Sequence, residues 1–132
     1  MKFSQIPYER ADIQAAALEI RKLAGKMKTA ASGEQQLAIH DEFYGIWDRL
    51  MTTVVTAHIR HDIDVSDPFY EKEQNYYDEQ LPKLHKEVVD YQDSLLASPF
   101  RDVLEKRIGK VAFTNMELQK RSVDDRDRKS VV

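Results

Sequence analysis

Residues 32–61 read SGEQQLAIHDEFYGIWDRLMTTVVTAHIRH, and apolar side chains recur in them at helical spacing. They step by three and four residues along one stripe, as on one face of an α-helix. The stripe consists of Leu37, His40, Tyr44, Trp47, Met51, Val54 and His58, widened by Phe43, Leu50 and Val55. So broad an apolar face must be covered by other helices. The pattern therefore predicts a helical bundle.

Capping residues indicate where this helix and an earlier one begin. Ser32 followed by Gln35 resembles a capping box, in which the side chain of each residue accepts a hydrogen bond from the backbone N–H of the other. Asp12 is predicted to cap the earlier helix, because its carboxylate can accept from the free N–H groups of a first turn. That helix has an apolar face of Ile13, Ala17, Ile20, Ala24 and Met27. Pro7 favours an extended backbone over residues 1–11.

A third helix is predicted after a connection that begins at Asp62. Asp67 before Pro68 indicates its start, because an acceptor at the N-cap and a fixed φ at the next residue both favour a first helical turn. Its pattern contains Phe69, Tyr76, Tyr77, Leu81, Leu84, Val88, Tyr91 and Leu95. Pro82 removes one helical hydrogen bond, so we expect a kink or a break between Asp78 and Pro82.

Shorter elements are predicted in the last third of the chain. Ser98 and Pro99 repeat the start pattern and precede a short fourth helix, which Gly109 is expected to end. The apolar residues of this helix are Phe100, Val103, Leu104 and Ile108, and a fifth helix is expected around Val111, Phe113, Met116 and Leu118. Residues 120–132 hold eight charges, which indicates a frayed end or a truncated helix.

These patterns together predict an all-α fold. We expect an antiparallel helical bundle of about four to five helices, two of them long. The bundle is assigned to residues 1–121, and residues 122–132 form a charged end. A chain of 132 residues suits one such domain and can bury a core without disulfides.

Composition limits the classes of partner and compartment. The net charge is −3, with 20 basic and 23 acidic residues interspersed, so no basic surface for nucleic acid is predicted. No apolar run reaches the roughly 18 residues that a membrane span needs. Residues 1–7 lack an apolar signal-peptide region, and cysteine is absent, which together favour a cytoplasmic location.

Sequence motifs for catalysis are missing from the chain. A metallopeptidase helix needs His-Glu-x-x-His, which places two imidazoles on one face and a glutamate beside the metal-bound water. None of the four histidines is followed by Glu, and no two are four residues apart. Glu-x-x-His and Gly-x-Ser-x-Gly are absent too. We therefore assign no catalytic residue and no metal ligand, and we predict that the chain alone is inactive.

Two side-chain groups have both a functional and a structural interpretation. His58 and His61 lie three residues apart and could join Asp62 or Asp64 around a metal, but two histidines without a fixed third ligand more often form hydrogen bonds at a helix end. Aromatic residues after Asp67 could face a peptide, although this spacing is more typical of a core. The candidates are Phe69, Tyr70, Tyr76 and Tyr77, while Glu71, Lys72, Glu73, Asp78 and Glu79 are expected to form a solvated face.

Three segments carry a resemblance to a known family. They are MKFS with IPYER at residues 1–10, IRHDID through DPFYEKE at residues 59–73, and LLASPFR at residues 95–101. In this order and spacing they resemble the start of an oligoendopeptidase F-type zinc metallopeptidase, and the likeness extends to about Arg121.

The resemblance implies a larger enzyme than this chain. In that family a helical shell encloses a channel, and zinc held by His-Glu-x-x-His and a later Glu hydrolyses oligopeptides. The chain would be the N-terminal part of the shell, truncated before the catalytic region and without zinc of its own. Its partners would be oligopeptides or the missing catalytic region, and apolar surface left uncovered predicts self-association.

A second interpretation remains open at this point. The chain could be a standalone helical bundle that binds a peptide or a protein partner through its aromatic stripe. A third interpretation, an inactive remnant without any ligand, has the same composition and is not distinguished from the second.

Overall fold

The computed structural model describes residues 7–130, and for residues 123–130 it describes the backbone alone. Five α-helices follow one another, and the described residues include no strand. They are α1 (Ile13–Thr29), α2 (Gly33–Ile63), α3 (Pro68–Leu96), α4 (Arg101–Ile108) and α5 (Lys110–Ser130). The prediction of an all-α bundle with two long helices is confirmed.

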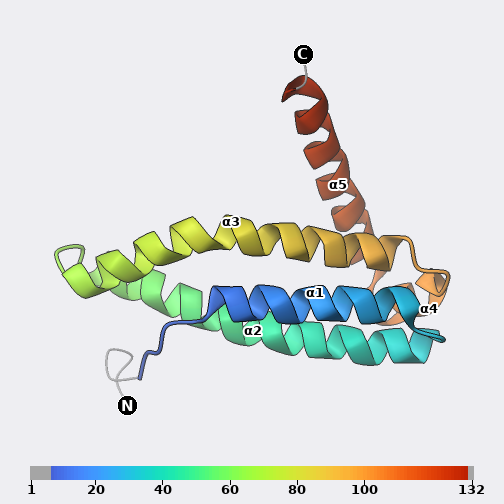
Figure 1. Ribbon diagram of the computed structural model, residues 1–132, viewed down its shortest axis with the longest axis horizontal. Coiled ribbons are helices and arrows are strands. Elements are labelled where there is room, and N and C mark those ends of the chain that lie inside the picture. Colours follow the sequence, from blue (N-terminus) through green and yellow to red (C-terminus); the bar gives the residue numbers. More distant parts are fainter. Residues whose placement is uncertain (1–6, 131–132) are drawn as a thin grey trace.

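Three helices form the body of the bundle. α1 and α3 run in the same direction, and α2 runs antiparallel to both (Figure 1). The short α4 lies at the end where α1 leads into α2. There the Cβ of any residue replacing Gly33 would lie 2.9 Å from Val103 Cγ1, so the glycine permits the close approach of α4 to α2. α5 starts beside α3 and α4, and its C-terminal half projects away from the bundle (Figure 1).

The predicted N-caps are present, with one difference of detail. Asp12 Oδ1 accepts from the Ala15 amide at 3.0 Å, and Asp67 Oδ1 accepts from the Phe69 amide at 2.9 Å. Ser32 Oγ accepts from the Gln35 amide at 3.1 Å, as a capping box requires. The reciprocal bond was wrongly predicted, because Gln35 Oε1 accepts from the amide of Ala31, at 2.8 Å, rather than from that of Ser32.

Proline and glycine act at their predicted places, with one correction. Pro82 lies inside α3, which is continuous from Pro68 to Leu96, so of the two predicted alternatives the break does not occur. The fourth helix begins at Arg101 instead of directly after Pro99, because the Ser98 hydroxyl accepts from the Phe100 amide at 3.0 Å and closes a turn first. Gly109 ends α4 with φ 103°, a left-handed value that favours glycine.

The buried face of α2 differs from the predicted stripe. Four of its buried residues are spaced by seven: Gln36, Phe43, Leu50 and Ala57. The predicted stripe lies to one side of this line, so that Tyr44 is 62% exposed and Val55 50% exposed. The sequence pattern was misleading because α2 is apolar around much of its circumference, and the position of α1 and α3 decides which part is covered.

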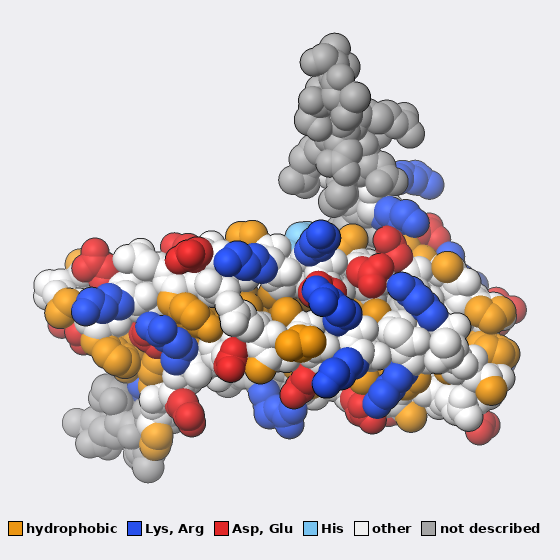
Figure 2. Space-filling view, viewed as in Figure 1, with side chains coloured by type: hydrophobic (Ala, Val, Ile, Leu, Met, Phe, Trp, Pro, Cys, Tyr) orange, Lys and Arg blue, Asp and Glu red, His pale blue; other side chains and the backbone are white. Residues whose placement is uncertain are grey.

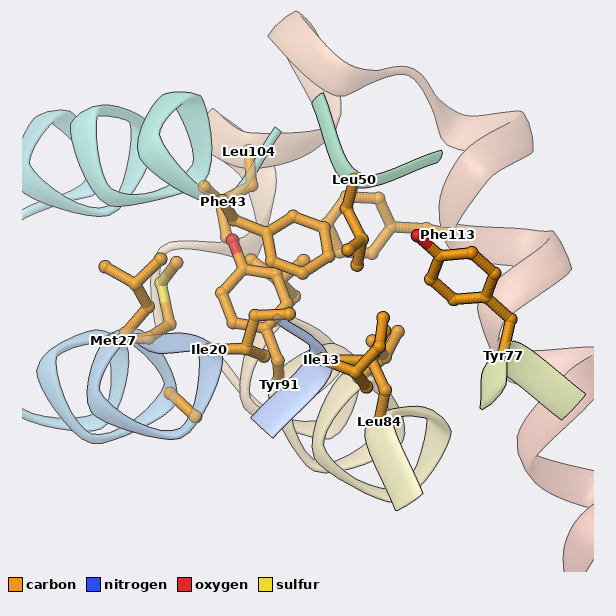
Figure 3. Close-up of a cluster of buried hydrophobic side chains, with 14 of the residues drawn as sticks. Ile13, Ile20, Met27, Phe43, Leu50, Tyr77, Leu84, Tyr91, Leu104 and Phe113 are labelled. Atoms are coloured by element: carbon orange, nitrogen blue, oxygen red, sulfur yellow. The ribbon is translucent and has the colours of Figure 1, made fainter. Parts of the chain in front are cut away.

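The core is one cluster to which all five helices contribute. Figure 3 shows its side chains converging on the space between the helices. Its fully buried large residues include Ile13, Ile20, Met27, Tyr77, Leu84, Tyr91, Leu95, Leu104 and Phe113. The rings of Phe43 and Tyr91 stack with their centroids 4.1 Å apart. This contact joins α2 to α3 at the centre of the bundle.

Next to this stack, a histidine lies partly inside the core. His40 Nδ1 is 2.9 Å from the Tyr91 hydroxyl, and burial lowers the pKa of His40 below its usual value. Asp41 opposes this shift and Arg107 adds to it, and these two charges pair with each other at 2.9 Å. His40 therefore stays neutral in the folded protein at a pH at which an unfolded chain would protonate it.

The stability of the protein should decrease in mild acid because of His40. The unfolded chain binds the extra proton below its histidine pKa of about 6.5, so the contribution of neutral His40 is complete above that pH and is lost as pH falls through the lower folded-state pKa. Urea unfolding between about pH 7.5 and about pH 5.5 should show a larger loss for the wild type than for His40→Gln. Equal losses in the two proteins would contradict this assignment.

The charged C-terminal segment continues α5. The helix runs to Ser130 without a break at the predicted boundary between residues 121 and 122, and Val131 and Val132 lie outside the described residues. On the face that carries α1, acidic and basic side chains are interspersed (Figure 2). Among the described helices, none is both long and apolar enough to cross a bilayer.

Candidate functional site

The four aromatic candidates lie in the first three turns of α3 and differ widely in exposure. Phe69 is 52% exposed, whereas Tyr77 has no exposed surface. Tyr70 and Tyr76 are partly buried. The rings of Phe69 and Tyr70 meet edge to face, with centroids 4.9 Å apart, and Tyr8 packs against both. In this structure Phe69 is the candidate most open to a ligand.

Tyr76 and Tyr77 hold the N-terminal segment against α3. The Tyr77 hydroxyl accepts from the Ala11 amide at 2.9 Å and lies 2.7 Å from the Tyr8 hydroxyl. The Tyr76 hydroxyl donates to the Ala11 carbonyl at 3.1 Å and accepts from the Ile13 amide at 3.3 Å. These bonds satisfy backbone groups next to the start of α1, which a helix cannot satisfy itself.

Glu73 is the centre of this cluster, and its predicted place on a solvated face was wrong. The residue is only 3% exposed. Its Oε1 accepts from the Tyr8 hydroxyl at 2.9 Å and from Arg10 Nε at 3.1 Å. Its Oε2 accepts from Arg10 Nε at 3.0 Å and also forms an ion pair with Arg10 Nη2. We call Tyr8, Arg10, Glu73, Tyr76 and Tyr77 the Glu73 cluster.

Electrostatics in the Glu73 cluster favour a charged carboxylate and neutral phenols. The hydrogen bond from Arg10 lowers the pKa of Glu73, against the opposing effect of burial. Burial, with hydrogen bonds to Tyr77 and Glu73, raises the pKa of Tyr8 far above its usual value. The Arg10 guanidinium also lies over the Tyr76 ring, 4.2 Å from its centroid.

The Glu73 cluster binds the chain to itself. A general base needs a free lone pair that faces a substrate, but both carboxylate oxygens of Glu73 already accept hydrogen bonds from Tyr8 or Arg10. The role of these groups is to fix residues 8–13 on α3. Sequence patterns missed this cluster because Arg10 and Glu73 are 63 residues apart and no helical period relates them.

A second polar contact links the end of α2 to α3. Arg60 is 8% exposed, and its Nη1 donates to the Tyr70 hydroxyl at 2.8 Å. Its guanidinium also lies 5.7 Å from the centroid of the Tyr70 ring. This pair fixes the orientation of Tyr70 beside Phe69. We call Phe69 and Tyr70 the half-exposed aromatic surface, and Arg60 gives it a rigid support.

The two neighbouring histidines occupy the last turns of α2. His58 Nδ1 is 3.2 Å from Gln74 Oε1, and its Nε2 is 3.3 Å from Asp62 Oδ2. This agrees with the predicted hydrogen bonding at a helix end. His61 is partly buried, and its Nδ1 has no hydrogen-bond partner. Across the part of the chain that the structure describes, no three His, Cys, Asp or Glu side chains are grouped to hold a metal ion.

Comparison with known proteins identifies the family. The model of the peptidase M3 N-terminal domain matches residues 3–123. This chain is a peptidase M3 N-terminal domain. The match covers both the Glu73 cluster and the half-exposed aromatic surface at the start of α3, so both lie inside the family domain. The predicted resemblance to the N-terminal part of this peptidase family is confirmed.

Solved structures support the assignment of this M3 domain. It is 37% identical to a protein described as an oligoendopeptidase F, with a TM-score of 0.85 over 90% of this chain and 21% of that one. It is 34% identical to PZ peptidase A solved with an inhibitor, with a TM-score of 0.84 over 88% of this chain and 21% of that one. It is 30% identical to a protein from Bacillus anthracis str. Ames that is described as an oligoendopeptidase F, with a TM-score of 0.83 over 89% of this chain and 22% of that one.

The M3 domain therefore spans about a fifth of the length of the solved proteins that it matches. A search of curated proteins found no match.

Proposed function

We propose that this domain is a non-catalytic wall of the substrate channel in a zinc oligoendopeptidase, and that residues 1–121 form the wall while residues 122–132 form a charged C-terminal end. The family match together with the coverage of about a fifth of each related chain carries the proposal. His-Glu-x-x-His is absent from all 132 residues. The parent enzyme would hydrolyse oligopeptides, and the cysteine-free composition fits a cytoplasmic location.

Zinc is assigned to the rest of the parent enzyme. The described residues offer no group of three suitable ligands, so the zinc of the family does not fit this domain and no step is derived through it here. What this domain supplies is a rigid surface beside the peptide. Phe69 is its best-placed side chain for that contact, since it packs against Tyr70, whose hydroxyl is held by Arg60.

A domain replacement tests this role. All 132 residues replace the matching segment of the oligoendopeptidase F that is 37% identical, and hydrolysis of a fluorescence-quenched oligopeptide is measured with and without a chelator. We expect chelator-sensitive hydrolysis by the chimera and none by the 132-residue chain alone. A folded but inactive chimera would contradict the proposal, as would chelator-sensitive turnover that remains with the isolated chain through several columns.

The same preparation tests the standalone interpretation. Titration calorimetry of the isolated chain with mixed oligopeptides should show no saturable binding, because a channel wall supplies only part of a peptide site. Saturable binding without turnover would instead favour an independent peptide-binding module.

A further inference from the structure

Three adjoining hollows of about 540, 420 and 220 Å³ lie along the side of the bundle formed by α2, α3 and α5. Trp47 lines the first two, His85 lines the first and third, and Met116 lines the second and third. Because neighbouring hollows share these lining residues, we treat the three together and call them the Trp47 groove.

Apolar side chains dominate the widest part of the Trp47 groove. Trp47 and Met51 of α2 face Leu81 and Pro82 of α3 across the largest hollow. Trp47, Met51 and Leu81 pack on the core from one side and remain partly exposed on the other. Tyr44, 62% exposed, extends the apolar surface toward α5. Contiguous apolar surface of this kind usually marks an interaction site.

The floor of the groove belongs to the core. His40, Phe43 and Tyr91 line the hollow nearest α5, and they are the residues of the central aromatic stack. An occupant would therefore extend the core and cover the edge of that stack. This explains why the apolar pattern of α2 is wider than the face that α1 and α3 bury: the additional side belongs to the groove.

The relatives indicate what fills this space. In the solved peptidases, about four-fifths of the chain lies outside the region that this domain matches. α5 lines one side of the groove with Ala112, Met116 and Gln119. Its C-terminal half then projects away from the bundle (Figure 1). Asp78 is the carboxylate at the apolar hollow, and it suits an occupant with a basic residue at that edge.

We propose that the Trp47 groove is the docking surface for the part of an M3 peptidase that follows this domain, and that an amphipathic helix of that part fills it. The proposal rests on the proposed function, since it takes the occupant from the same parent enzyme. The groove differs from the Glu73 cluster in its chemistry. The groove is largely apolar and open to a partner, whereas the polar groups of the cluster already bind residues of their own chain.

Cysteine labelling tests the groove, because the natural chain contains no cysteine. Tyr44→Cys places a thiol in the groove, and Leu18→Cys places one on α1 at a similarly exposed position, 53% against 62%. Maleimide labelling of each site is followed by mass spectrometry in the 132-residue chain and in the chimera described above. We expect at least a tenfold slower reaction of Tyr44→Cys in the chimera, and a change of less than about twofold for Leu18→Cys.

The outcomes separate this inference from the proposed function. An active chimera in which Tyr44→Cys reacts as fast as in the isolated chain would overturn the groove assignment and leave the proposed function standing. A protected Tyr44→Cys in an inactive chimera would support the groove and contradict the channel role. Protection that appears in the isolated chain as its concentration rises would identify a second copy as the occupant and overturn the proposal.

A charge variant supplies a second measurement that does not depend on the fusion. The intact chain is mixed with the separately produced remainder of the 37% identical oligoendopeptidase F, and binding is measured. Tyr44→Glu should weaken binding at least tenfold, because it places a charge in an apolar contact, whereas Leu18→Glu should leave it within about twofold. Equal effects of the two variants, or no binding of the wild-type chain, would count against the groove as the docking surface.

Discussion

Tyr91→Ala is expected to lower the free energy of unfolding by about 3–5 kcal/mol, the range for removing a large aromatic side chain from a core. Tyr91 has no exposed surface, stacks on Phe43 at 4.1 Å and contacts His40 through its hydroxyl. The substitution would leave a cavity where α2 and α3 meet. Urea unfolding followed by far-UV circular dichroism measures the loss.

Two further substitutions show how much of this loss comes from the hydroxyl of Tyr91 and how much comes from the buried position of its ring. Tyr91→Phe keeps the stack and loses the contact with His40, so we expect a loss of about 1 kcal/mol. Tyr44→Ala removes the same side chain from an exposed position on α2, so its effect should stay within about 0.5 kcal/mol. Similar losses for Tyr44→Ala and Tyr91→Ala would show that the core is not centred on this stack.

Glu73→Gln should cost about 2 kcal/mol, because it replaces charge-assisted hydrogen bonds in a buried site by weaker neutral ones. Tyr8 and Arg10 both donate to the carboxylate, which is 4% exposed as a side chain. Arg10 is 48% exposed, so solvent screens part of the ion-pair energy and the loss stays below that for a fully buried pair. Urea unfolding near neutral pH gives the magnitude.

The pH dependence of this effect has a definite sign. The folded state lowers the pKa of Glu73 below its ordinary value of 4.5, chiefly through Arg10. The stabilisation is therefore complete above the unfolded pKa and is lost as pH falls through the lower folded-state pKa. The difference between wild type and Glu73→Gln should shrink in that acidic range.

A control on the same helix shows whether burial is responsible. Glu79→Gln makes the same chemical change at an exposed position of α3, and we expect it to change the free energy of unfolding by less than about 0.5 kcal/mol. Amide hydrogen exchange at Ala11 adds a local readout, because that N–H donates to Tyr77 inside the Glu73 cluster. Unchanged protection of Ala11 in Glu73→Gln would mean that Glu73 does not anchor the N-terminal segment.

Local sequence signals predict the starts of α1, α2 and α3 and the end of α4. Asp12, Ser32 and Asp67 cap their helices through contacts within three residues, and Gly109 ends α4 through its own backbone angle. Such interactions are local, so they can be predicted from neighbouring residues. The family resemblance was also present in the sequence, in three short segments that lie, apart from residues 1 and 2, within the match over residues 3–123.

Which surfaces are buried and which polar groups pair depends on how the helices pack. The apolar stripe of α2 admits several orientations, and contact with α1 and α3 selects the line through Phe43 and Leu50 and leaves Trp47 beside an open groove. Glu73 looks like one more charge on a helix, yet Arg10, 63 residues earlier, meets it. Contacts across such distances depend on how the helices pack, and no periodicity in the sequence encodes them.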